Sequence, residues 1–375
     1  MSMPVDSKWA PIYRIIKEGL QNQVYTAAVA LVGVKGELLW EGAAGRLSGE
    51  PQAPAVTLET VFDLASLTKP LATALAVMRL RDKGQLALDT TLSEILPQEW
   101  LPEDKRRLTI LSLLAHRAGL PAWRPFYREV LAAPPAERPT LPARLAAATP
   151  LEYPPDTQTL YSDLGYMLLK EVVEAVAEED LDSFCRRGIY RPLNLATLGF
   201  NPQRQAGGHR LQFAATEEGL IPGRNISGEV HDENAWAAGG VAGHAGLFGT
   251  GREVFTMLAA LYAAYHGDRV GPFSPDSVRL FLTPVAGSSR TLGFDTLNAE
   301  AGQCSAGRYF SPMSVGHLGF TGASFWLDLE LGQMVVLLTN RVHLGRDDKT
   351  RIQAFRPRFH EAASKALGFT KEFRK

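Results

Sequence analysis

Two almost continuously apolar segments lie near opposite ends of the chain, and they constrain its fold more than any other feature. Residues 24–34 read VYTAAVALVGV and residues 334–339 read MVVLLT. Short valine-rich runs without polar interruption are typical of buried strands. Residues 35–36 form a predicted turn, and residues 37–44 are the expected hairpin partner of the first strand. The two ends of the chain are therefore expected to contribute strands to one sheet.

Most segments between these strands have helical patterns. We predict an α/β (α+β) protein with an antiparallel sheet flanked by helices, plus an all-helical sub-domain. Residues 1–75 and 240–375 are expected to form the discontinuous sheet domain, and residues 76–239 the helical insertion. A short strand is expected at residues 61–63 and a longer one at residues 319–329, and residues 199–228 are expected to be irregular and polar. Helices are predicted at residues 9–20, 71–83, 108–120, 167–177, 181–190, 252–265 and 351–367.

The composition excludes several classes of partner. The 375 residues are 45% hydrophobic and 21% charged, with a net charge of −1. This balance predicts no nucleic-acid partner and no membrane insertion, and leaves a small-molecule or short-peptide substrate. Residues 1–20 do not resemble a signal peptide, so we expect a cytoplasmic protein, or a periplasmic one only if a signal has been removed. Cys185 and Cys304 lack metal-ligand spacing and are expected to be reduced thiols.

The segment FDLASLTKP, residues 62–70, carries the first chemical signal. Ser66 and Lys69 are three positions apart and share one face of a helix. A serine hydroxyl becomes a good nucleophile only when a neighbouring base removes its proton. A lysine one turn away can act as that base if its pKa is lowered. This S-x-x-K arrangement occurs in penicilloyl serine transferases, but alone it is a weak signal.

Two further motifs follow in a fixed order. Residues 161–163 read YSD and residues 317–319 read HLG. Together with S-x-x-K, they resemble the motifs of the serine β-lactamase and penicillin-binding-protein superfamily, in particular its class C-like branch. The flanking segments at residues 113–120, 161–169 and 316–322 are similar to that branch as well. The resemblance covers residues 24–367 and implies a β-lactamase/DD-peptidase-like fold.

The resemblance also implies roles for individual residues. Ser66 would form an acyl-enzyme, Lys69 would share or accept its proton, and Tyr161 would be a second candidate base. The sequence does not decide between Lys69 and Tyr161. The oxyanion hole would consist of the backbone N–H groups of Ser66 and Phe320. Gly319 would keep the strand edge open to substrate.

Two positions depart from the family pattern. Asp163 replaces the usual asparagine of Y-x-N, and a carboxylate can only accept hydrogen bonds or pair with a cation. Asp163 is expected to pair with Lys69, to contact a substrate amide or amine, or to cap the helix that follows. His317 replaces the lysine common in β-lactamases and would be a poorer anchor for a penicillin carboxylate. Both changes favour an amidase, peptidase or esterase over an efficient β-lactamase.

Other candidates are less specific. The loop around His231 and Asn234 is expected either to line the acyl site or to bond to itself. Metal binding by His231, Asp232 and His244 is a third reading. Asn340 and Arg341 follow the last strand, where the arginine could grip a substrate carboxylate or form a surface ion pair. The remaining suggestions are His116 as a structural histidine capping the helix at 108–120, and four aromatic residues as cleft walls, namely Trp123, Phe126, Tyr127 and Trp236.

The predicted function is a serine hydrolase with an acyl-enzyme at Ser66. It is expected to act on amide or peptide bonds of peptidoglycan-type fragments, or weakly on β-lactams. The mechanism requires only side chains and backbone donors, so no cofactor and no metal are expected. The alternatives are a carboxylesterase on small esters, a non-catalytic ligand-binding module with the same fold, and a metallohydrolase.

Overall fold

The computed structural model describes residues 7–205, 211–217, 226–298 and 304–373. A six-stranded sheet in the order β2-β1-β9-β8-β7-β6 is antiparallel throughout, and a small three-stranded sheet has the order β3-β5-β4. The strands of the large sheet are β1 (Ala27–Val34), β2 (Glu37–Gly45), β6 (Asp295–Thr296), β7 (Ser314–Leu318), β8 (Ser324–Asp328) and β9 (Gln333–Thr339). Those of the small sheet are β3 (Phe62–Asp63), β4 (Gly199–Phe200) and β5 (Leu247–Gly249).

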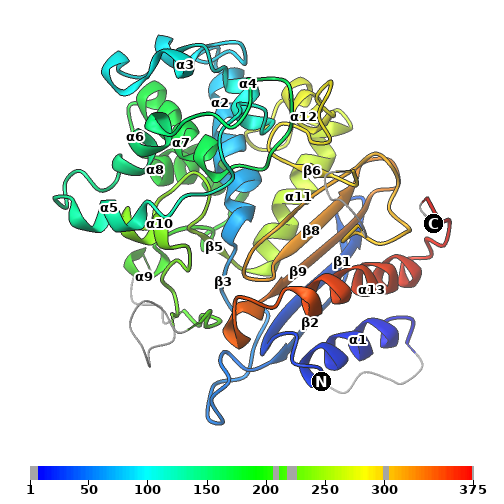
Figure 1. The fold of residues 1–375 in the computed structure, drawn as a ribbon. Coiled ribbons are helices and arrows are strands. Elements are labelled where there is room, and N and C mark those ends of the chain that lie inside the picture. Colours follow the sequence, from blue (N-terminus) through cyan, green and yellow to red (C-terminus); the bar gives the residue numbers. More distant parts are fainter. Residues whose placement is uncertain (1–6, 206–210, 218–225, 299–303, 374–375) are drawn as a thin grey trace.

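The large sheet joins the two ends of the chain, as the two apolar segments predict. Val34 of β1 pairs with Gln333 of β9, and the register continues to Ala28 and Thr339. Successive side chains of β1 alternate between two apolar clusters because neighbouring residues of a strand point to opposite faces. Figure 1 shows helices on both faces, which explains why this strand lacks polar positions.

Helices α1 and α13 pack against each other and cover one face of the sheet (Figure 1). Helix α11 packs on β9 and β1 from the other face. The helices of this framework and of the segment between the strands are α1 (Ala10–Gln21), α2 (Leu75–Asp82), α3 (Glu103–Arg106), α4 (Ile110–Leu114), α5 (Tyr127–Ala132), α6 (Leu141–Ala148), α7 (Asp163–Ala177), α8 (Leu181–Cys185), α9 (Pro202–Gln205), α10 (Glu233–Ala237), α11 (Gly251–Tyr265), α12 (Pro275–Leu282) and α13 (Thr350–Ala366).

The predicted helical insertion shares its core with the sheet. One apolar cluster runs from Val29 of β1 and Val336 of β9 through Leu75 of α2 to Leu168 of α7. The division of the chain at residues 75 and 240 remains a prediction. Within the described ranges, no helix has both the length and the apolar character needed to cross a membrane.

Three predicted segments differ from the structure, and one of them is the stretch 199–228, expected to be irregular, which begins with β4 and α9. The helix expected at 108–120 ends at Leu114, and the chain leaves it through His116, which has φ +57°. The strand expected at 319–329 is shorter, because residues 319–323 form the turn between β7 and β8. Strand β7 was not predicted from the sequence. Of the segment expected to be irregular, residues 206–210 and 218–225 lie outside the described part of the chain.

Candidate active site

Ser66 lies in a 3₁₀ turn, Ala65–Leu67, directly after β3. Ala65 has φ +48°, a left-handed conformation that costs energy for any residue with a Cβ. The buried Asp63 carboxylate holds this turn by accepting hydrogen bonds from Ala65 N at 2.8 Å and His231 N at 2.7 Å. Thr68 Oγ1 donates to Ala65 O at 2.6 Å and closes the other side. The surrounding contacts therefore fix the position of the serine hydroxyl.

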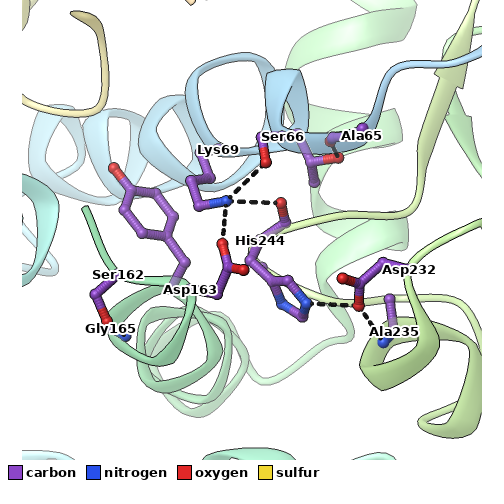
Figure 2. A network of polar contacts seen from close by, with 12 residues as sticks. Ala65, Ser66, Lys69, Ser162, Asp163, Gly165, Asp232, Ala235 and His244 are labelled. Carbon is purple, nitrogen blue, oxygen red and sulfur yellow. Dashed lines mark hydrogen bonds and ion pairs between the residues drawn. The ribbon is translucent and has the colours of Figure 1, made fainter. Parts of the chain in front are cut away.

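Lys69 is fully buried, and its ammonium group meets three acceptors (Figure 2). Its Nζ lies 2.6 Å from Asp163 Oδ1, 3.1 Å from His244 O and 3.2 Å from Ser66 Oγ. An ammonium group has three hydrogens, and the Tyr161 side chain is a further hydrogen-bond partner of this group. Burial by itself lowers the pKa of Lys69, but the attraction of Asp163, then Tyr161, outweighs burial and leaves this pKa raised. The structure therefore holds Lys69 as a cation.

Asp163 is available for this pair because its neighbour caps the helix. Ser162 is the N-cap of α7, and its Oγ accepts a long hydrogen bond from Gly165 N at 3.4 Å (Figure 2). The reading of Asp163 as the N-cap is therefore wrong. Asp163 is the first residue of α7, where a carboxylate also interacts favourably with the helix dipole.

Tyr161 lies between two cations at the same site. Lys69 Nζ is 4.7 Å from the centre of the Tyr161 ring, and Arg290 Cζ is 5.0 Å from it. The ring also packs against His317, with 5.9 Å between ring centres. Both cations lie close enough to stabilise negative charge that develops at this ring during a reaction. The arrangement can therefore support a tyrosine acting as a base.

His116 positions the segment that carries Tyr161. It does not cap α4; its Nδ1 accepts a hydrogen bond from Ser162 N at 3.0 Å, and its carbonyl accepts one from Leu160 N at 2.9 Å. Its ring lies 4.6 Å from the Tyr161 ring. Burial, followed by the charges of Arg290 and Lys69, lowers the pKa of His116 well below 6.5. The neutral ring can therefore remain an acceptor.

The motif H-x-G lies at the end of β7, next to the serine turn. A Cβ added at Gly319 would be 2.8 Å from Leu64 O, which is closer than side chains normally approach backbone oxygen. Glycine is therefore required where these two segments touch. Burial, then Lys69 and Arg290, lowers the pKa of His317 well below 6.5, so its imidazole is neutral and carries no charge to hold a carboxylate.

These groups surround a cavity of about 280 Å³. Four cations and one carboxylate line it, together with the motif residues. The pairing of Arg290 with Asp295 compensates one of the cations. The lining residues are Ser66, Tyr161, Arg290, Asp295, His317, Leu318, Gly319, Phe320, Arg341, Lys349, Ile352, Gln353 and Arg356. The excess of positive charge suits a substrate that carries an anionic group.

Asn340 and Asn234, which were predicted to contact substrate, instead form hydrogen bonds with backbone groups. Asn340 Oδ1 accepts a hydrogen bond from Ala27 N at 2.7 Å and so joins the start of β1 to the end of β9. Asn234 Oδ1 accepts from Tyr127 N at 2.7 Å, and Asn234 Nδ2 donates to Arg124 O at 2.9 Å. Neither asparagine lines the cavity. Their amides are satisfied by backbone groups, so a substrate contact would have to break these bonds.

The loop from Gly228 onward reaches the cavity only at its edge. The His231 ring stacks on Phe320 with 5.7 Å between ring centres, and Arg346 Nη2 lies 3.2 Å from His231 Nε2. His244 Nε2 instead lies 2.9 Å from Asp232 Oδ1 (Figure 2). Of the three suggested metal ligands, Asp232 and His244 therefore pair with each other, whereas His231 contacts Arg346 and Phe320. In the described ranges, no group of three or more His, Cys, Asp or Glu side chains is arranged to hold a metal ion.

The aromatic residues suggested as cleft walls lie outside this cavity. Phe126 is buried in the main core, whereas Trp123 and Trp236 are partly exposed. Trp236 lines a different pocket of about 260 Å³. Arg341 does line the cavity, and its Nε donates to Phe320 O at 3.0 Å. Arg290 and Arg356 have no sequence motif of their own, and the sequence-based reading missed both.

A serine hydroxyl lies beside a buried ammonium group, and a tyrosine lies between two cations. This arrangement is the active site of a hydrolase whose nucleophile is a serine. Residues 12–356 match the family model described as Beta-lactamase. The chain belongs to the Beta-lactamase family, and the sequence-based predictions of family, fold class and hydrolase activity are confirmed.

The relatives and structural neighbours agree with this family. A protein of Escherichia coli (strain K12) named "Putative D-alanyl-D-alanine carboxypeptidase" is 36% identical over 327 residues, covering 80% of this chain and 74% of that protein. An "N-acetylmuramyl-L-alanine amidase" of Bacillus subtilis (strain 168) is 32% identical and covers 76% of this chain and 68% of the amidase. The solved structure of "EstCE1, a hydrolase with promiscuous acyltransferase activity" superimposes with a TM-score of 0.70 at 22% identity, covering 95% of this chain and 98% of EstCE1, and so supports the fold.

Proposed function

We propose that this protein hydrolyses amide bonds in peptidoglycan-derived peptides through an acyl-enzyme on Ser66. The observation that carries the proposal is the contact of Ser66 Oγ with the buried Lys69 ammonium group at 3.2 Å, at the wall of the cavity. The names of the two relatives support the substrate class, since both refer to amide bonds of cell-wall peptides. Two positive charges at the ring of Tyr161 support a base at the same place.

Tyr161 is the better candidate for the base. Asp163, His244 O and Ser66 Oγ surround Lys69 as a cation, and an ammonium nitrogen has no lone pair with which to accept a proton. The Tyr161 phenolate takes the proton of Ser66 as Oγ bonds to the carbonyl carbon. Tyr161 then returns that proton to the leaving nitrogen as the carbon–nitrogen bond breaks. Water enters by the same route in reverse, and Ser66 regains its proton when the acid product leaves.

The charge of the cavity favours a carboxylated substrate. Arg341 and Lys349 both line the cavity and lie over the Phe320 ring, at 4.7 and 4.9 Å from its centre. The C-terminal carboxylate of a short peptide is a suitable counter-charge. His317, which is neutral, is expected to orient such a group by a hydrogen bond.

Intact mass spectrometry tests the nucleophile. After incubation with a penicillin, the wild type should gain the mass of one penicillin, and Ser66→Ala should gain none. Ser183→Ala, which removes an exposed serine on α8, is the matched control and should react like the wild type. An adduct that persists in Ser66→Ala would overturn the assignment of the nucleophile.

A substrate screen tests the bond type. Cell-wall peptides ending in D-alanine and N-acetylmuramyl peptides should be cleaved by the wild type and left intact by Ser66→Ala. Rapid hydrolysis of p-nitrophenyl esters with every amide left intact would instead identify a carboxylesterase. Unchanged ligand affinity in Ser66→Ala, with no turnover by either protein, would identify a non-catalytic binding module.

A further inference from the structure

The peptide unit between Gly319 and Phe320 lies in a tightly bonded turn. Gly319 N donates to Ala323 O at 2.7 Å, and Gly322 N donates to Gly319 O at 3.0 Å. Gly322 has φ +111°, a conformation that side chains disfavour. The N–H of this peptide unit belongs to Phe320 and is the second donor of the proposed oxyanion hole. Its carbonyl belongs to Gly319 and faces away along the same amide plane.

Arg356 of α13 forms a hydrogen bond with this carbonyl. Its Nη2 donates to Gly319 O at 3.0 Å and to Ala323 O at 2.8 Å. The side chain is buried at the wall of the active-site cavity, with only 5% of its surface exposed. One guanidinium group therefore bridges both ends of the turn. Arg341 supports the following peptide unit through Phe320 O.

A charged donor on a carbonyl oxygen changes the other end of the same amide. The amide is conjugated, so electron density drawn to the oxygen leaves the N–H more positive and a stronger donor. Hydrogen bonds from ionised donors are about twice as strong as neutral ones. The field of Arg356 also reaches the cleft, because it contributes, after burial, Lys69 and Arg290, to the lowered pKa of His317.

We propose that Arg356 is a positioning residue for acyl transfer, whose guanidinium group fixes and polarises the Gly319–Phe320 peptide unit so that its N–H stabilises the oxyanion. This inference rests on the proposed function, because it assumes that an oxyanion forms beside Ser66. Arg356 acts through the backbone and contacts no reacting atom. Its loss should therefore slow chemistry more than it weakens substrate binding.

The test compares Arg356→Met with Arg358→Met. Arg358 is two residues away on the same helix, is 55% exposed and pairs with Glu18, so its variant controls for the helix and the lost charge. Removing a whole oxyanion donor costs about 100- to 1,000-fold in kcat. Weakening one should lower kcat by roughly 10- to 100-fold in Arg356→Met, with KM within about twofold. Affinity for a boronic acid that forms a tetrahedral adduct should fall by the same factor as kcat.

A spectroscopic measurement makes the test independent of turnover. In protein labelled with ¹⁵N-phenylalanine, the Phe320 amide signal can be assigned by its loss in Phe320→Leu. This signal should move upfield in Arg356→Met and stay in place in Arg358→Met, since a weaker donor has a less deshielded proton. If Arg356→Met does not fold, Arg356→Lys provides the same comparison, with partial retention of rate and chemical shift.

The outcomes separate this inference from the proposed function. If Ser66 of the wild type is not acylated by any probe, the proposed function fails and the inference fails with it. If the wild type is acylated, and folded Arg356→Met retains both its kcat and its Phe320 amide shift, the inference alone is overturned. Equal losses in Arg356→Met and Arg358→Met would also overturn it, because helix stability would then explain the effect.

Discussion

Replacing Asp163 with asparagine tests how much the buried ion pair with Lys69 contributes to the free energy of unfolding and to the charge of Lys69. The two charged atoms are 2.6 Å apart, with Lys69 fully buried and the Asp163 side chain 17% exposed. Removing one member of a buried pair costs about 3–5 kcal/mol. Asparagine keeps one oxygen that can accept from Lys69, so we expect a loss of about 2–3 kcal/mol.

This loss converts into a modest change in melting temperature. The entropy of unfolding is about 2.1 cal/mol/K per residue, which for a chain of 375 residues gives about 0.8 kcal/mol/K. Asp163→Asn should therefore lower Tm by about 2.5–4 °C. Asp156→Asn is the matched control, because that carboxylate is 56% exposed and lies 3.6 Å from Arg117. Its effect should stay within about 0.5 kcal/mol.

A double-mutant cycle with Lys69→Met isolates the pair itself. Urea unfolding of the wild type, both single variants and the double variant should give a coupling free energy of about 2 kcal/mol. Because the pKa of Lys69 is raised in the folded state, this stability should be fully present below its ordinary value of 10.5 and disappear as pH rises through the folded pKa. A coupling near zero at pH 7 would refute the reasoning.

The same variant should change the pH dependence of the reaction. Asp163 helps Lys69 to keep its proton, so Asp163→Asn should lower the pKa of Lys69. The alkaline limb of the kcat/KM profile should then move to lower pH, because fewer molecules carry the Lys69 cation beside Ser66 and Tyr161. An alkaline limb that stays in place would show that Lys69 does not act as the cation.

Three further predictions concern the site and its support. Gly319→Ala should lower kcat by about 100-fold by displacing Leu64 and the serine turn, whereas Gly188→Ala, whose added Cβ meets no described atom within 4 Å, should leave kcat unchanged. Tyr161→Phe should slow acylation by about 10²- to 10⁴-fold in stopped-flow assays and leave Tm nearly unchanged; an unaltered rate would eliminate Tyr161 as the base. Burial, then Arg356, lowers the pKa of His360 to about 3, so the folded state resists protonation of this residue. The free energy of unfolding should therefore fall by up to about 2 kcal/mol between pH 6.5 and pH 5. Urea unfolding at both pH values checks this, and His360→Gln should show a smaller change.

Local patterns were sufficient to predict most of the framework. Strands β1 and β9 followed from uninterrupted apolar runs, because burial leaves a direct signature in the sequence, and the helix predicted at 351–367 agrees with α13. The helix expected at 108–120 was too long because His116 adopts a left-handed conformation, and that conformation depends on its partner, Ser162. Strand β7 has only five residues, one of them glycine, and lacked such a signature.

The motif residues were easier to predict than their surroundings. The order of the three motifs brought Ser66, Lys69 and Tyr161 to one place, but it did not give the direction in which neighbouring side chains point. Asn340 is adjacent to a cavity residue in sequence, yet its amide turns back to hold β1. Arg356 has no motif at all, and only the packing of α13 against the turn after β7 brings its charge under a backbone carbonyl.

The pairing of β1 with β9 also determines how late in synthesis of the chain the large sheet can form. Val34 cannot meet Gln333 until roughly 300 further residues have left the ribosome, which takes about 15–60 s at synthesis rates of roughly 5–20 residues per second. During that interval β1 can pair with β2, while its other edge has no strand to bind. The nascent protein therefore exposes an unpaired apolar strand edge, which is prone to aggregate, for most of its translation. We expect chaperones that shield unfinished chains to contribute more to the yield of this enzyme than those that act after release.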